Sequence, residues 1–107
     1  MATVTKRPIV IQDLIEKATY IAEDNLDAAE NFLTAAEATF QKLGNFPEAG
    51  KLTSFQSPRL AGVRQYPIKG FKKYLIFYRV GDREIEILRV LHGAMDVVSV
   101  LDGSIEL

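Results

Sequence analysis

The sequence predicts an α+β fold in which a short N-terminal strand and a helical hairpin pack on an antiparallel β-sheet. Apolar residues recur at helical spacing through residues 11–43. From residue 63 onward, β-branched and aromatic residues form short runs separated by glycines. The composition, 48% hydrophobic and 25% charged, is typical of a folded soluble protein. We expect one domain, residues 1–107, of order β-α-α-β-β-β with a short C-terminal segment.

The first strand and the first helix are predicted at the N-terminus. Residues 7–11, RPIVI, form a β-branched run, and Pro8 is acceptable in such a strand if it lies at a sheet edge. A helix should follow and end near Asp24, because apolar and charged residues largely separate onto two helical faces. The predicted apolar face holds Ile11, Leu14, Ala18, Ile21 and Ala22, and the polar face holds Asp13, Glu16, Lys17 and Glu23.

A second helix is predicted directly after the first. Asn25 is suited to cap it, and Asp27 lies favourably in its first turn. Its apolar stripe consists of Ala29, Phe32, Leu33, Ala36, Phe40 and Leu43. Gly44 should end the helix, since Pro47 follows closely. Because almost no chain separates the two helices, they should form an antiparallel hairpin.

Three strands are predicted after a loop that ends near residue 62. They cover residues 63–68, 74–80 and 84–91. Gly70 supplies the first turn between them and residues 81–83 supply the second. Such short connections predict an antiparallel meander.

The last two strands are predicted to be buried on both faces. With a two-residue loop, facing residues have numbers of opposite parity. One face then holds Ile76, Tyr78, Val80, Ile85, Ile87 and Arg89, and the other holds Leu75, Phe77, Arg79, Glu86, Leu88, Val90 and His92. We expect the helices to cover one face and the C-terminal tail or a partner protein to cover the other. Arg79 and Glu86 should form an exposed cross-strand pair.

The sequence also excludes several classes of protein. The N-terminus has no apolar stretch long enough for a signal peptide, and no later stretch is long enough to span a bilayer. The chain has no cysteine, so we expect a cytoplasmic protein with no membrane partner. A single histidine among scattered carboxylates lacks metal-ligand spacing, and no nucleotide-binding glycine motif is present. We therefore expect no metal and no other cofactor.

The charge is sorted along the chain although the net charge is only −1. Residues 1–50 carry four Lys/Arg against eight Asp/Glu, whereas residues 51–93 carry nine Lys/Arg against three Asp/Glu. A basic segment suggests an acidic partner, either nucleic acid or an acidic protein surface. The alternative interpretation is a solvated face that happens to be basic.

The strand-rich half resembles a known family. The segment GFKKYLIFYRVGDREIEILRVLHGAMD, residues 70–96, closely resembles the C-terminal signature of ParE-type toxins of the ParE/RelE superfamily. Upstream, DLIEKATYIAEDNLDAAENFL (13–33) resembles the first helix pair of that family. FPEAG (46–50) and LAGVRQYPIKGF (60–71) resemble its loop and second strand. The resemblance covers almost the whole chain and has the same order of elements.

The resemblance implies the toxin of a bacterial type II toxin–antitoxin module, a class associated with plasmid stabilization. Such a toxin is neutralised by an antitoxin whose C-terminal segment wraps its surface, so a hetero-oligomer is expected. Operator DNA would be reached only indirectly, through the antitoxin. In the gyrase branch, which resembles ParE, the toxin binds DNA gyrase and performs no covalent chemistry.

The superfamily also contains a ribonuclease branch, which resembles RelE and cleaves mRNA on the ribosome. That chemistry needs a base, an acid and cations, for which Arg64, Lys69, Arg89 and His92 are candidates. Three features favour the gyrase branch: a slightly acidic pI near 5.8, a closing motif HGAMD of ParE type, and a tail without a late Tyr or Lys. A third alternative is an attenuated toxin that acts only as co-repressor with its antitoxin, since Met95 replaces the usual arginine of the family.

No catalytic residue is assigned on the preferred interpretation, and the basic residues become contacts for the target or the antitoxin. These candidates are Arg59, Arg64, Lys69, Lys72, Lys73, Arg89 and His92. For His92 the alternatives are an imidazole hydrogen-bonded to loop backbone beside Gly93, or a partner contact. Asp96 should either cap a short terminal helix over residues 97–101 or pair with Arg89.

Overall fold

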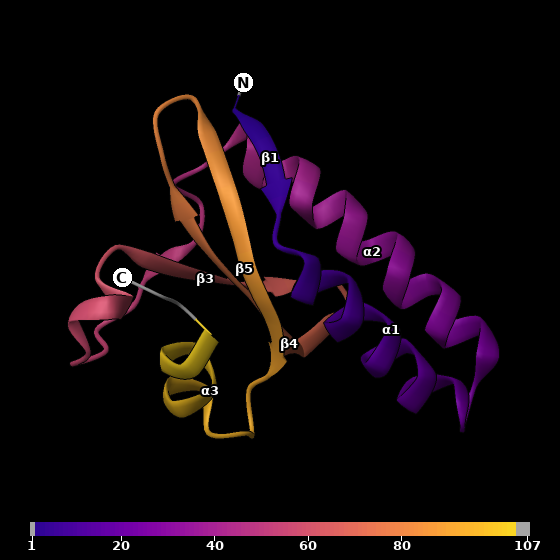
Figure 1. Cartoon of the computed structure of the whole chain (residues 1–107). Helices are drawn as coiled ribbons and strands as arrows, with labels where there is room; N and C mark the ends of the chain where they lie inside the picture. The colour runs from indigo at the N-terminus through magenta and orange to yellow at the C-terminus, as the bar shows by residue number, and fades with distance from the viewer. Residues whose placement is uncertain (1, 105–107) are drawn as a thin grey trace.

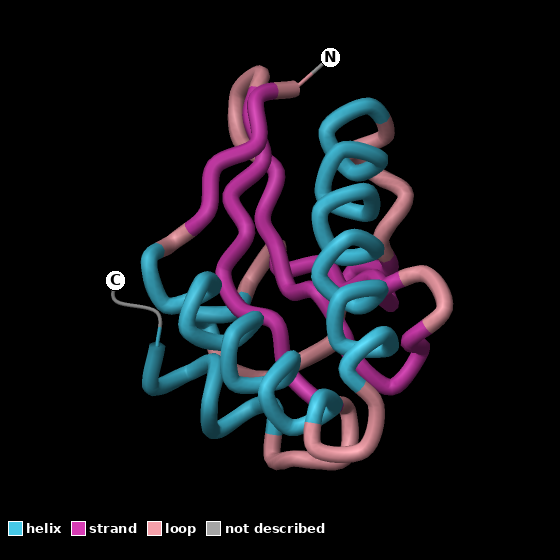
Figure 2. The backbone as a smooth tube through the Cα atoms, turned by 90° about the vertical axis from the view of Figure 1, so that its right-hand side faces the viewer, coloured by secondary structure: helices cyan, strands magenta, loops and turns pink. Residues whose placement is uncertain are grey.

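A five-stranded sheet separates a helical hairpin from a short C-terminal helix (Figures 1 and 2). The computed structural model describes residues 2–104. The elements are β1 (Thr3–Lys6), α1 (Pro8–Ala22), α2 (Leu26–Asn45), β2 (Lys51–Leu52), the 3₁₀ turn η1 (Pro58–Leu60), β3 (Val63–Ile68), β4 (Phe71–Val80), β5 (Glu84–His92) and α3 (Val97–Ser104). The strand order is β1-β5-β4-β3-β2, with β1 parallel to β5 and the other neighbours antiparallel. The predicted α+β fold and its meander are confirmed.

The first strand lies upstream of its predicted position. The prediction of a strand at residues 7–11 was wrong: β1 spans Thr3–Lys6, and Pro8 begins α1. Arg7 is extended at the helix N-cap, with φ −68° and ψ 148°. A proline at the first helical position loses no hydrogen bond and has its φ already set for a helix. The β-branched run therefore forms the first turn of a helix.

The start of the second helix agrees with prediction, whereas its end does not. Asn25 caps α2, since its Oδ1 accepts a hydrogen bond from the Ala28 amide at 3.0 Å. Gly44 does not stop the helix, which continues to Asn45. A Cβ at Gly44 would lie 2.8 Å from the Val4 side chain. The glycine lets β1 pass close to α2, where the Ala2 amide donates to the Gly44 carbonyl at 2.8 Å.

The buried face of α1 is rotated from the predicted one. Val10, Asp13, Lys17 and Ala18 are buried, whereas Ile11 remains 49% exposed. The two buried charged residues of α1 were predicted to lie on its polar face.

A β-bulge changes the register of the last hairpin. Opposite-parity pairing holds from Val80–Ile85 to Tyr78–Ile87, but the next pair is Phe77–Arg89. Leu88 is therefore the additional residue, and such a residue re-aims the side chains that follow it. The later pairs are Ile76–Val90, Leu75–Leu91 and Tyr74–His92.

The bulge moves residues of β5 to the other face of the sheet. Val90 joins the core under the helices, and His92 lies beside Tyr74 and helix α1. The prediction that Val90 and His92 share a face with Leu88 was wrong, as was the grouping of Arg89 with Ile76. A periodic pattern carries no sign of a single inserted residue.

Two apolar cores lie on the two faces of the sheet. One core, under the helical hairpin, centres on Phe32, Phe40 and Tyr78. The other joins Phe77 and Leu88 to η1 and α3. Of the two covers proposed for this second face, the C-terminal tail is present, and Leu101 of α3 is fully buried there.

The predicted pair of Arg79 with Glu86 does not form. The two residues face one another across the strands, as expected. Glu86, however, accepts from Arg7 Nε at 3.2 Å, and Arg79 donates to the Arg59 carbonyl at 2.7 Å. Strand register places two residues opposite each other without choosing their partners, which the N-cap residue of α1 and the turn η1 supply here.

Tyr78 fastens the loop after α2 to the sheet. Its buried hydroxyl donates to the Pro47 carbonyl at 2.7 Å and accepts from the Gly50 amide at 2.8 Å. Burial raises the pKa of Tyr78, so it keeps its proton at neutral pH.

Replacing Tyr78 with phenylalanine should lower the free energy of unfolding by about 1–3 kcal/mol, because a buried amide and carbonyl lose their partner. Urea denaturation followed by circular dichroism measures this difference. Tyr66→Phe is the matched control, since its hydroxyl bonds only the exposed Lys42. Equal losses in both variants would contradict the role given to Tyr78.

Candidate functional site

The carboxylate of Asp13 joins helix α1 to strand β5. It accepts from Arg89 Nε at 2.8 Å and from Arg89 Nη2 at 2.7 Å, a two-pronged ion pair. It also accepts from the Val90 amide at 3.0 Å. The Asp13 side chain is only 4% exposed, so these charge-assisted bonds are shielded from water. The bonds with Asp13 raise the pKa of Arg89 despite its burial, and the guanidinium stays charged.

Arg89 also reaches the C-terminal helix. Its Nη1 donates to Ser104 Oγ at 2.6 Å, and Arg7 Nη1 donates to the Ser104 carbonyl at 3.3 Å. The guanidinium is therefore shared between α1 and α3. Such a group is held in place by the fold and is a poor candidate for binding phosphate.

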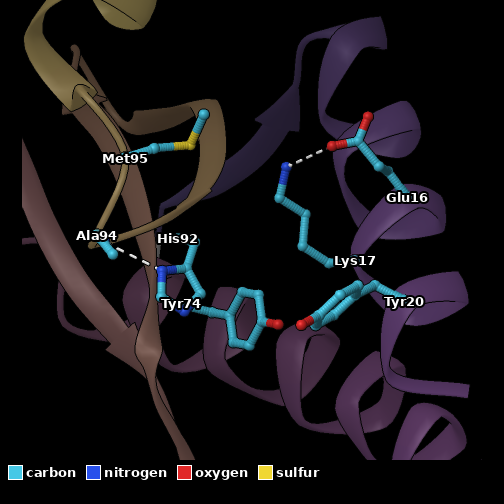
Figure 3. A pocket seen from close by; sticks show the side chains of 7 residues that line it. All are labelled: Glu16, Lys17, Tyr20, Tyr74, His92, Ala94 and Met95. Carbon is cyan, nitrogen blue, oxygen red and sulfur yellow. Dashed lines mark hydrogen bonds and ion pairs between the residues drawn. The ribbon is translucent and has the colours of Figure 1, made fainter. Parts of the chain in front are cut away.

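Beside this ion pair, the end of β5 and helix α1 border a pocket of about 510 Å³ that is open to solvent (Figure 3). The pocket is lined by Glu16, Lys17, Tyr20, Tyr74, His92, Ala94 and Met95. Its one ammonium, on the buried Lys17, lies 3.2 Å from a Glu16 oxygen and 3.9 Å from an Asp13 oxygen. The cation is thus compensated by carboxylates.

His92 has a structural hydrogen bond. Its Nδ1 accepts from the Ala94 amide at 3.0 Å, so a neutral ring carries its proton on Nε2. The ring meets Tyr74 edge-on, with centroids 5.1 Å apart. The interpretation of His92 as an imidazole bonded to loop backbone beside Gly93 is confirmed. The same ring also lines the pocket, so it is available for contact with a partner.

Two tyrosine hydroxyls complete the pocket. Figure 3 shows those of Tyr20 and Tyr74 pointing toward one another across it. Burial, and secondarily Tyr20, raise the pKa of Tyr74, so it remains a neutral donor. The pocket offers these hydroxyls and the imidazole Nε2 between aromatic rings and the Met95 thioether. Hydrogen-bond donors in apolar walls suit the binding of a side chain from a partner.

The other sequence-predicted contacts are spread over the molecule. Arg59 lies on η1 and contacts the Asp102 carbonyl at 3.5 Å. Arg64 on β3 donates to the Gly50 carbonyl at 2.8 Å. Lys69, at the turn before β4, and Lys72 and Lys73, in the first residues of β4, are exposed. Of the seven candidates, Lys72, Lys73 and His92 line one common hollow, next to the pocket.

Asp96 has the first of its two predicted roles. Its carboxylate accepts from the Ser99 amide at 3.3 Å and from the Ser99 hydroxyl at 3.0 Å, at the start of α3. The alternative pairing with Arg89 does not occur, because Asp13 occupies that guanidinium. The helix extends three residues beyond the predicted end, to Ser104.

Sequence reasoning missed the contribution of α1 to the site. Asp13, Lys17 and Tyr20 were not among the candidates. Charged residues such as Asp13 and Lys17 in an amphipathic pattern normally face solvent. The available signal was that Asp13 and Lys17 lie at helical spacing from Val10 and Leu14. Within residues 2–104, no group of three His, Asp or Glu side chains is arranged to hold a metal. In the same range, no helix combines the length and apolar character needed to cross a membrane.

A family model and solved structures match this chain. A family model described as the ParE toxin of the type II toxin–antitoxin system, parDE, matches residues 5–97. A solved structure, the chromosomal ParDE TA system from P. aeruginosa, superimposes with a TM-score of 0.68 at 19% sequence identity. That match covers 86% of this chain and 96% of the other. No curated protein matches the sequence.

Asp13→Ala should destabilise the fold by about 3–5 kcal/mol, because it leaves a buried guanidinium unpaired. Glu86→Ala is the control, since it breaks the more exposed pair with Arg7 and should cost about 1 kcal/mol or less. Urea denaturation measures both losses. The double variant Asp13→Ala/Arg89→Met should lose less than the sum of its single variants. Strict additivity would contradict the coupling inferred from the geometry.

Proposed function

Because the chain belongs to the ParE toxin family of type II toxin–antitoxin systems, we propose that it is a toxin that inhibits DNA gyrase, and so DNA replication, by binding alone. It acts in the cytoplasm, where gyrase works. A cognate antitoxin neutralises it by covering its surface in a hetero-oligomer. Operator DNA is reached through that antitoxin.

The observation that supports binding without catalysis is that the groups a nuclease would need are already engaged by other parts of the fold. Arg89 is held by Asp13 and Ser104, and Arg64 is held by the Gly50 carbonyl. His92 already uses Nδ1 as an acceptor for the Ala94 amide. Cleavage of RNA needs a base, an acid and a cation around one phosphate. This arrangement supports a binding protein.

We further propose that the pocket of Figure 3 receives an anchor residue of the antitoxin. Tyr20 is 69% exposed and Met95 is 40% exposed, on opposite sides of that pocket. Exposed apolar side chains around a cavity suit an apolar anchor from a partner segment that folds on binding. Met95, where the family pattern has arginine, makes this wall apolar without removing the pocket.

Expression without antitoxin from a tightly controlled promoter tests the function. DNA synthesis should fall first and the DNA-damage response should rise, while protein synthesis continues. Incorporation of labelled thymidine and of labelled amino acids in the first minutes separates the two processes. An immediate stop of translation with cleaved mRNA would contradict the proposal, and undisturbed growth would favour an attenuated toxin.

His92→Asn should leave toxicity intact, because the asparagine carbonyl can accept the Ala94 amide in place of Nδ1. The imidazole is lost in this variant. If His92 were a general acid or base, the activity would instead fall by about 10²–10⁴-fold. Growth arrest at matched protein levels measures the difference, and His92→Ala, which lacks the acceptor, shows the cost of losing the hydrogen bond.

A further inference from the structure

Four exposed lysines surround the turn between β3 and β4. Lys42 of α2, Lys69 of the turn and Lys72 of β4 line one hollow, and Lys72 and Lys73 line the next. Since Lys72 lines both hollows, the two hollows adjoin and bring the four lysines to one region of the surface. We call Lys42, Lys69, Lys72 and Lys73 the lysine row.

The charges of the lysine row are not neutralised within the described part of the chain. None of the four forms an ion pair with a carboxylate there. Lys42 instead donates to the Tyr66 hydroxyl at 2.8 Å. Within residues 2–104, no carboxylate lines the hollows around the turn. A concentration of uncompensated positive charge on a slightly acidic protein attracts polyanions.

The turn that carries the row is fixed to the core. Ile68 is fully buried, and the Phe71 ring packs edge-on against Phe32 with centroids 5.3 Å apart. The Lys69 amide donates to Thr39 Oγ1 of α2 at 3.4 Å, and the Lys73 carbonyl accepts from the Gly93 amide at 2.7 Å. The lysines are therefore presented on a rigid support, which lowers the entropic cost of binding.

The surroundings of the row favour phosphate over protein as its occupant. Among the described residues, no large apolar side chain that stays exposed lines these hollows. Protein interfaces depend on aromatic and apolar anchors and are poor in lysine. A nucleic-acid backbone, in contrast, is held largely by lysine and arginine charges. Gly70, at φ +84°, has open space where a side chain would stand, so a backbone could approach the turn closely.

We propose that the lysine row binds the phosphate backbone of duplex DNA. The binding itself depends only on the charges of the toxin. The identity of that DNA rests on the proposed function: it is the segment that gyrase holds when the toxin is bound. The toxin would then contact both the enzyme and its substrate.

DNA binding by the lysine row can be measured by fluorescence anisotropy. The purified chain is mixed with a short labelled DNA duplex over a range of salt concentrations. The logarithm of the binding constant should fall linearly with the logarithm of the salt concentration. Lys72→Gln and Lys73→Gln should each weaken binding and lower the slope by about one unit. Lys51→Gln, which removes an exposed charge from β2 outside the row, should leave the slope unchanged. Circular dichroism checks that each variant folds.

The proposal would be overturned by no DNA binding at low salt, by equal slopes for Lys72→Gln and Lys51→Gln, or by tighter binding of polyglutamate than of duplex. Preferential binding of single-stranded RNA would retain the phosphate chemistry but refute DNA as its source. The assay contains no gyrase, so its failure is distinguishable from failure of the proposed function. In the opposite case, DNA binding without gyrase inhibition would refute only the placement of the DNA on gyrase.

Discussion

The buried carboxylate of Asp13 joins helix α1 to strand β5 just beyond the residues of β5 that pair with the edge strand β1. β1 pairs with β5 as far as Ile87, and farther along β5 the Val90 amide donates to the Asp13 carboxylate. The same carboxylate holds Arg89, which in turn reaches Ser104 of α3. One side chain thus fixes the relative positions of the helical hairpin, the sheet and the C-terminal helix. Removing it would leave the Arg89 charge without a counter-ion and the Val90 amide without its acceptor.

This constraint also determines what the site can do. Because Arg89 is paired with Asp13, this cation of the basic half is withdrawn from any reaction. The bulge at Leu88 then turns His92 toward α1, where it faces Tyr74 and an open pocket. The result is a surface of hydrogen-bond donors, apolar walls and, farther along β4, uncompensated lysines. Such a surface is suited to hold partners, and the proposed toxin needs nothing more.

The helical hairpin and the meander could be predicted because each depends on a local pattern. Asn25 is a residue type typical of helix N-caps, and strands that are joined by short turns are expected to be neighbours in a sheet. The errors arose where two local interpretations compete or where the deciding contact is distant. Pro8 is as compatible with an edge strand as with a first helical turn. The role of Gly44 depends on β1, which passes close to it only in the folded protein.

The site was less predictable than the fold for the same reason. The basic candidates were found by charge, but charge does not show that Arg89 is paired 76 residues away with Asp13. The single-residue bulge that orients His92 leaves no trace in an alternating pattern. Tyr20 and Lys17 become site residues only through the packing of α1 on β5.

The claim that this protein acts by binding alone is tested most directly by titrating purified gyrase with it in a DNA supercoiling assay. Inhibition should saturate near a stoichiometric ratio of toxin to gyrase, and added antitoxin should reverse it. Unimpaired supercoiling, together with mRNA cleavage on ribosomes by a small fraction of that amount, would contradict this claim.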